Sequence, residues 1–294
     1  MEKKEFIIGK RPQKEWGWLI ILALFFTGSG AGSFFFALIL GSVTRMLMGV
    51  ILVLVGALFL LADLSRPLSG WRVILRPQSS WITRGALGII SFFVLSVLYM
   101  LAVSLQHGRS VSLSGAPWTT GPTWLMVLGV LSGAVALFVA AYPGFLLGSM
   151  RAIPFWNTAL LPVLFMISGL LCGLGEIYLM PLQWEGQTWG LVLLNSLSVG
   201  LLILGFFLLL SLILTVHSGT TKESVRLLTS GSLRSQFVAG VIGIGVIVPL
   251  IILVLIFGGA TGTSLLPIAG ILLTLGMLLF RYSILKAGIY TTPV

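Results

Sequence analysis

Long uninterrupted apolar runs constrain this chain more than any other feature. Eight of them approach or exceed the roughly 20 residues that an α-helix needs to cross the hydrocarbon core of a bilayer. They span Trp16–Leu40, Met46–Ala62, Ala86–Leu105, Thr123–Gly148, Thr158–Met180, Trp189–Val216, Gln236–Phe257 and Thr263–Leu285. The runs do not alternate, and inside a bilayer such runs satisfy their backbone groups only as helices. The sequence therefore predicts an all-α integral membrane protein with eight transmembrane helices.

Composition agrees with this fold class. Only 8% of the residues are charged and the mean hydropathy is +1.13, which is outside the usual range of soluble domains. The first run is too long for a signal-peptide core and no convincing cleavage site follows it, so we expect it to be retained. We predict a single domain of two four-helix bundles, residues 16–148 and 149–294, after a tail of residues 1–15.

The basic residues are distributed unevenly over the predicted loops. All 17 Lys and Arg residues except Arg45 and Arg109 fall on the side that carries both termini. By the positive-inside rule this side is cytoplasmic, and tryptophans such as Trp16 and Trp156 are expected at that boundary. The net charge of +10 is assigned to anionic lipid and topology rather than to nucleic acid, because the charges lie in loops beside helices.

Several self-sufficient chemistries are excluded by residue type and position. One cysteine, Cys172, cannot hold an iron–sulfur cluster. His107 and His217 end helices on opposite sides of a membrane about 30 Å thick, so the two cannot ligate one haem. P-loop, HExxH and GxSxG motifs are absent from the sequence. We expect no haem, no metal site and no catalytic residue acting alone in this chain.

The loop predicted between the second and third helices begins at Asp63. Pro67 disfavours helix at the residue before it, so Asp63 falls in the last helical turn. A carboxylate there opposes the helix dipole at a cost of roughly 0.3–1 kcal/mol. We expect Arg66 and Arg84 to compensate for this charge.

The same loop repeats an Arg-Pro-x-Ser-x-Trp pattern at ten-residue spacing. A short interfacial turn between the repeats would place two arginines on one face. One interpretation is a membrane-surface anchor, and the other is a docking surface for an extrinsic partner or a lid over a headgroup site. The candidate docking residues are Arg66, Trp71, Arg72, Arg76 and Trp81.

The fourth helix carries Tyr142 and Pro143 shortly before its cytoplasmic end. Proline removes a backbone donor, which favours a kink and a small polar cavity beside Tyr142. Tyr142 is either an interfacial belt residue or a buried hydroxyl. Its depth of about 9 Å, at 1.5 Å per residue, favours the buried hydroxyl.

Polar residues elsewhere in the spans carry weaker signals. Glu176 and Asn195 lie near the opposite side, and ionisable residues within a membrane are functional candidates by default. A solvated helix end is the alternative for Glu176. The run from Gly28 to Ser33 in the first helix is expected to be a close-packing face.

With these motifs in place, the chain resembles the NrfD/PsrC-like family of membrane subunits of modular oxidoreductases. The matching segments occur in family order along the whole chain. They are Gly28–Gly32, Asp63–Pro67, Trp71–Arg72, Ser80–Gly85, Tyr142–Leu147, Ile153–Asn157, Leu161–Pro162, Ser168–Gly169, Arg281–Tyr282 and Ala287–Gly288.

The resemblance implies electron and proton exchange between a quinone, typically menaquinone, and a four-cluster ferredoxin-like subunit bound to a larger catalytic subunit. Tyr142 resembles the tyrosine of the family's quinone site, and Asp63 a position often occupied by an acid or histidine. Trp16 and Arg84 share the predicted face and complete our candidate quinone site. We assign proton transfer to Asp63 and Glu176.

Two departures from the family pattern stand out. Relatives can carry Asn or His in the first turns of the first helix, whereas this chain is apolar after Trp16. Many relatives bind an exported partner, whereas the basic face here predicts a cytoplasmic partner at a prokaryotic cytoplasmic membrane. Two alternatives remain open: a structural or conformationally coupled subunit without quinone chemistry, and a proton channel or secondary transporter.

Overall fold

The computed structural model describes residues 11–64, 80–107, 122–180, 188–215, 219–259 and 263–291. In this part of the chain eight helical segments are long and apolar enough to cross a membrane, as predicted. They are α1 (Trp18–Ile39), α2 (Val43–Asp63), α3 (Trp81–His107), α4 (Thr123–Gly148), α5 (Leu160–Leu179), α6 (Thr188–Leu214), the continuous pair η2 (Ser235–Ile247) and α8 (Val248–Phe257), and α9 (Leu266–Lys286) with its leading turn η3 (Thr263–Leu265).

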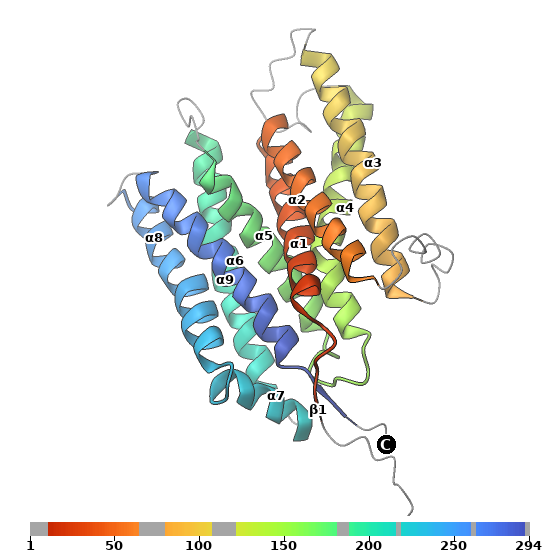
Figure 1. The fold of residues 1–294 in the computed structure, drawn as a ribbon. Helices are drawn as coiled ribbons and strands as arrows, with labels where there is room; N and C mark the ends of the chain where they lie inside the picture. Colours follow the sequence, from red (N-terminus) through yellow and green to blue (C-terminus); the bar gives the residue numbers. More distant parts are fainter. Residues whose placement is uncertain are drawn as a thin grey trace, which may run out of the picture.

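Two central helices hold the molecule together. The buried share of the span window is 72% in α1 and 78% in α5, against 28% in α2 and α6. Figure 1 shows α1 to α4 on one side and α5, α6, α8 and α9 on the other. The arrangement agrees with two four-helix groups that meet along α1 and α5.

Glycines allow the central helices to approach closely. A Cβ atom on Gly30 would collide with the backbone of α2 at Gly49 and Val53, and one on Gly32 would collide with the carbonyl of Gly169 on α5. Small residues at such positions permit backbone contact between membrane helices. The predicted close-packing role of the Gly28–Ser33 run is therefore confirmed for these two glycines.

The seventh span departs from a regular α-helix. Its first 13 residues, η2, have π-helical hydrogen bonding, although π-helical segments are usually single turns. Pro249 follows at the start of α8 and donates no backbone hydrogen bond to the preceding turn. Within η2, Gly245 packs directly against the Cα atom of Gly276 on α9. Periodicity predicted the span but not its altered winding.

The two ends of the described chain form a small sheet that we call the terminal clasp. Strands β1 (Arg11–Pro12) and β2 (Ile289–Tyr290) are antiparallel. The buried side chain of Gln13 donates to the Leu285 carbonyl (2.9 Å) and accepts from the Trp16 amide (2.9 Å). Part of the predicted tail is thus an ordered element bound to the end of α9.

Charged and phenolic groups flank the clasp on its exposed side. Arg11 donates to Glu15 across 3.0 Å. The backbone amides of Glu15 and Lys14 hold the pKa of the Glu15 carboxyl below its ordinary value. Partial burial raises the pKa of the Tyr290 phenol.

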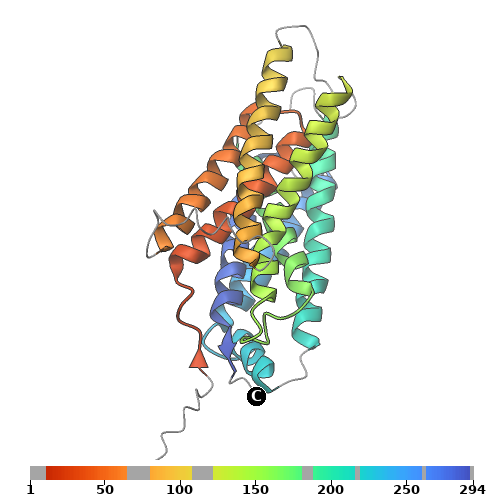
Figure 2. The same ribbon diagram turned by 90° about the vertical axis from the view of Figure 1, so that its right-hand side faces the viewer.

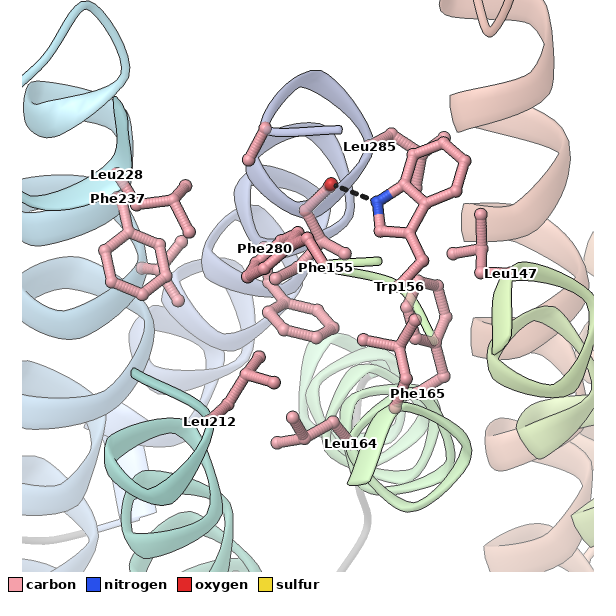
Figure 3. Packing of buried hydrophobic residues seen from close by; sticks show 14 of the residues in the cluster. Leu147, Phe155, Trp156, Leu164, Phe165, Leu212, Leu228, Phe237, Phe280 and Leu285 are labelled. Carbon is pink, nitrogen blue, oxygen red and sulfur yellow. Dashed lines mark hydrogen bonds between the residues drawn. The ribbon is translucent and has the colours of Figure 1, made fainter. Parts of the chain in front are cut away.

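Trp156 belongs to the core, so its assignment to the interfacial belt is wrong. Its side chain is fully buried and its indole donates to the Ile284 carbonyl at 2.9 Å, as Figure 3 shows. The ring of Trp16 meets it edge-on at 5.5 Å. The segment between α4 and α5 places Trp156 against the end of α9. Its predicted position near a helix end did not indicate this burial.

Both ends of the described chain lie at the same end of the bundle, as predicted (Figures 1 and 2). The amphipathic helix α7 (Gly219–Thr229) covers this end beside β2. Its Lys222 and Arg226 side chains extend from this end, and Arg234 after it is exposed. Their clustering with the termini agrees with the predicted charge asymmetry, while the cytoplasmic assignment of this end stays a prediction.

Candidate functional site

Tyr142 lies in α4 against the first turns of α3. Its side chain is only 6% exposed, which supports a buried hydroxyl over a belt position. The phenol ring occupies the place that a Cβ atom on Gly85 would take, and Phe138 lies beside it at 6.4 Å between ring centroids. Helix α4 continues through Pro143 to Gly148. The glycine on α3 is therefore what admits the tyrosine ring.

The start of α3 also carries an aromatic residue and a cation. Helix α3 begins at Trp81, five residues before the predicted start, so the segment from Trp81 to Gly85 is helical and not loop. The Trp81 ring stacks on Phe145 of α4 at 5.0 Å and an interplanar angle of 3°. The Arg84 guanidinium lies 4.7 Å from the Trp81 ring. This stacking accompanies the early helix start, and hydropathy does not register it.

A groove of about 460 Å³ opens one turn away from Tyr142. Aromatic, aliphatic and short polar side chains all contribute to its lining. The lining residues are Trp81, Phe145, Gly148, Ser149, Asn157, Thr158, Ala159, Pro162 and Val163. Since apolar pockets with a few convergent polar groups are typical ligand sites, this groove is the candidate entrance to a site at Tyr142.

The other two predicted quinone-site residues, Trp16 and Asp63, belong to other elements. The backbone carbonyl of Trp16 accepts from Lys286 at 3.3 Å, and its ring packs on Trp156, so it belongs to the clasp region. Asp63 is exposed in the last turn of α2. Of the four predicted residues, Tyr142 packs on the first turn of α3, and Arg84 belongs to that same turn.

Glu176 lies in the core rather than at a solvated helix end. It is 5% exposed, which rules out the solvated alternative. Its neighbours are Ser29 and Ser33 of α1 and Arg281 of α9. Asn195, the other polar residue noted in the spans, donates to the Leu253 carbonyl at 3.1 Å and so joins α6 to α8.

Arg281 is among the basic residues predicted on the cytoplasmic side, and that placement is wrong. The side chain is 0% exposed and lies between α1, α5 and α9. Charge counting uses the position of a residue along the chain, whereas an arginine side chain extends back over the preceding turn. One signal was available, because residue 281 falls inside an apolar run already predicted to span the membrane.

A family model described as Polysulphide reductase, NrfD matches residues 7–293 of the chain. The chain belongs to the NrfD family. The predicted resemblance is thereby confirmed, together with the multi-pass membrane character of the fold.

Three curated relatives of the NrfD family match most of the chain. The C chain of polysulfide reductase from Wolinella succinogenes is 29% identical, with 93% of this protein and 94% of the relative covered. Protein NrfD of Escherichia coli is 25% identical over 93% and 94% of the two proteins. The NrfD homolog of Haemophilus influenzae is 22% identical over 82% and 83%.

Most of the predicted docking surface lies outside the described part of this NrfD-family protein. Arg66, Trp71, Arg72 and Arg76 lie outside the described residues. Trp81 is described, and it lines the groove beside Tyr142. Among the described residues, no group of three His, Cys, Asp or Glu side chains is placed to hold a metal ion.

Proposed function

We propose that this chain is the membrane anchor and quinone-reactive subunit of a multi-subunit respiratory oxidoreductase. It passes electrons between the menaquinone pool and a ferredoxin-like iron–sulfur subunit, which in turn serves a larger catalytic subunit. The proposal draws on the family and on a relative named as part of polysulfide reductase. The observation that carries it is a buried tyrosine packed on the first turn of α3, where Trp81 lines an aromatic groove and contacts Arg84.

The residues around Tyr142 fit a quinone headgroup. A quinone carbonyl requires a hydrogen-bond donor, which the Tyr142 hydroxyl supplies within the span. Trp81 and Phe145 offer flat apolar surface to a ring. Arg84 supplies positive charge that favours an anionic reduced ring. Menaquinone contributes a two-electron, two-proton redox couple when bound.

Proton exchange is assigned to two carboxyl groups. Asp63, exposed at the end of α2, is proposed to exchange protons between the quinone site and the aqueous phase. Glu176 is proposed as a proton-transfer group in the core between α1, α5 and α9. The partner is proposed to bind at the cytoplasmic face, which carries the exposed basic residues, in a prokaryotic cytoplasmic membrane.

The substitution Tyr142→Phe tests the quinone site. Loss of one hydrogen bond to a reacting carbonyl should lower quinol-linked turnover of the purified complex by about tenfold or more. Complex assembly, measured by co-purification of the partner subunits, should be unchanged. Turnover with an artificial electron donor that reaches the catalytic subunit directly should also be preserved.

Tyr99→Phe is the matched control, because Tyr99 is also a buried tyrosine within a span. It should leave quinol-linked turnover unchanged. Wild-type turnover in Tyr142→Phe would remove Tyr142 from the mechanism. Absence of quinone from the purified complex by mass spectrometry, with turnover insensitive to added quinol, would favour a purely structural subunit.

A further inference from the structure

The groove lined by Trp81, Phe145 and Asn157 is accessible from the bilayer and is uncharged. Phe145 of α4 and Val163 of α5 line it and belong to membrane spans, yet 36% and 39% of their surfaces are exposed. None of the described lining residues is charged. An anionic lipid headgroup would require a cation there. The groove, of about 460 Å³, therefore suits a neutral, lipid-soluble ligand.

Asn157 supplies this groove with a polar group that the fold does not use. The Ser149 hydroxyl donates to the Leu146 carbonyl at 2.7 Å. Thr158 Oγ1 accepts from the Leu160 amide at 3.3 Å, at the start of α5. The Asn157 carboxamide is exposed and makes no hydrogen bond within the described part of the chain. The described turns and helix caps thus do not account for an asparagine at this position.

The backbone around Asn157 is held in place. Its own amide donates to the Pro154 carbonyl at 3.2 Å, and the Thr158 amide donates to the Trp156 carbonyl at 2.8 Å. The indole of Trp156 is in turn bound to the Ile284 carbonyl of α9 by the 2.9 Å hydrogen bond drawn in Figure 3. The carboxamide is therefore presented to the groove by a preorganised backbone, which lowers the entropy cost of binding a ligand.

A carboxamide matches both redox states of a quinone ring. Its NH₂ group donates hydrogen bonds and its oxygen accepts them. The carbonyl oxygen of an oxidised quinone only accepts, whereas the hydroxyl of the reduced quinol also donates. Because the last side-chain torsion of asparagine is broad and roughly two-fold, the amide can turn either group toward the same ligand oxygen.

We propose that Asn157 binds a ring oxygen of the quinone in both redox states, by donating to the quinone carbonyl and by accepting from the quinol hydroxyl. Trp81 and Phe145 offer apolar ring surface in the same groove. This inference rests on the proposed quinone function. It adds to that function a binding residue that was not among the predicted site residues.

The experiment measures binding rather than turnover. The purified complex is dialysed to equilibrium against a short-tailed naphthoquinone without an electron donor, and against its reduced form under anaerobic conditions without an electron acceptor. Asn157→Leu removes both hydrogen-bonding groups at similar size, so it should weaken the binding of both forms about three- to tenfold.

Asn157→Asp separates the two hydrogen bonds. An exposed aspartate is ionised at neutral pH and only accepts hydrogen bonds. Binding of the oxidised form should weaken at least as much as in Asn157→Leu, whereas binding of the reduced form should stay within about twofold of wild type. A merely structural role of Asn157 would not separate the two forms.

Gln236→Leu is the matched control, because it removes a half-exposed amide on η2, outside the groove. It should leave the binding of both forms unchanged. Wild-type binding in both Asn157 variants would overturn the proposed role of Asn157, as would equal weakening of both forms in Asn157→Asp. A phospholipid that co-purifies with wild type but not with Asn157→Leu, detected by mass spectrometry, would assign the groove to lipid instead.

Failure of this inference is distinguishable from failure of the proposed function. If the Asn157 variants bind both forms like wild type while Tyr142→Phe loses quinol-linked turnover, the role of Asn157 is overturned and the quinone function stands. If wild type binds neither form of the naphthoquinone, the quinone function fails and the role of Asn157 fails with it.

Discussion

The contact between Tyr142 and Gly85 shows how one missing side chain defines a site. Hydropathy and depth predicted the burial of the tyrosine, because both depend only on position within a span. They did not predict which residue of α3 receives the ring, since that depends on how α3 and α4 are rotated about their axes. Gly85 was part of a predicted loop and became informative only when its neighbour was known.

Gly85→Ala should be disruptive despite adding a single methyl group. The new Cβ atom would overlap the Tyr142 ring, and overpacking of this kind costs about 1–3 kcal/mol. We expect a lower melting temperature of the detergent-solubilised complex and reduced quinol-linked turnover. Gly200→Ala is the matched control, since nothing lies within 4 Å of its Cβ position. Equal melting temperatures for the two variants would show that the ring can move aside.

The same reasoning explains two misplaced residues. Trp156 and Arg281 were assigned to the boundary because both fall near the ends of predicted helices. In the structure both side chains are fully buried, one donating to the Ile284 carbonyl and the other enclosed beside Gly28. Sequence position sets the height of a residue in the membrane, whereas the direction of its side chain depends on neighbouring helices.

At the scale of elements, the spans were predictable and their connections were not. Apolar length located all eight spans because a bilayer imposes that length on any helix. The terminal clasp has no such signal, since its strands are two residues long and join opposite ends of the chain. The π-helical winding of η2, whose Gly245 packs against Gly276 of α9, likewise leaves no signal in apolar length.

Gln13→Ala should weaken the clasp. The Leu285 carbonyl and the Trp16 amide each lose a hydrogen-bond partner, and leaving such groups unsatisfied costs about 1–3 kcal/mol. We expect a lower melting temperature and faster proteolysis of the N-terminal segment. The exposed neighbour substitution Lys14→Ala should change neither. If Gln13→Ala melts like wild type, the clasp contributes nothing to stability.

At the scale of the whole molecule, sidedness is the main prediction still to be tested. Hydropathy located the spans, and charge bias assigned the end with both termini to the cytoplasm. Because Arg281 is buried within the bundle, it no longer counts among the basic residues at the end that carries both termini. Lys222, Arg226 and Arg234 remain at this end. The orientation matters because it decides on which side the iron–sulfur partner would bind.

Cysteine labelling in intact cells tests this orientation. The native protein has one cysteine, Cys172, which is fully buried, so background labelling should be low. Ser232→Cys lies at the end with both termini, and Thr123→Cys at the opposite end; both positions are exposed. A membrane-impermeant maleimide should label Thr123→Cys alone, with Ser232→Cys labelled only after lysis. The reverse labelling pattern would show that the predicted orientation is inverted and that the partner binds outside.

The terminal clasp also sets the order in which the molecule can be completed. Gln13 is synthesised before the eight described spans, whereas its carbonyl partner, Leu285, is synthesised only at the end of the eighth. Because β1 pairs with β2, the N-terminal segment must stay in the compartment where the C-terminal segment emerges. Closure thus follows the synthesis of all eight spans, and the clasp forms only when these spans have been inserted with correct topology.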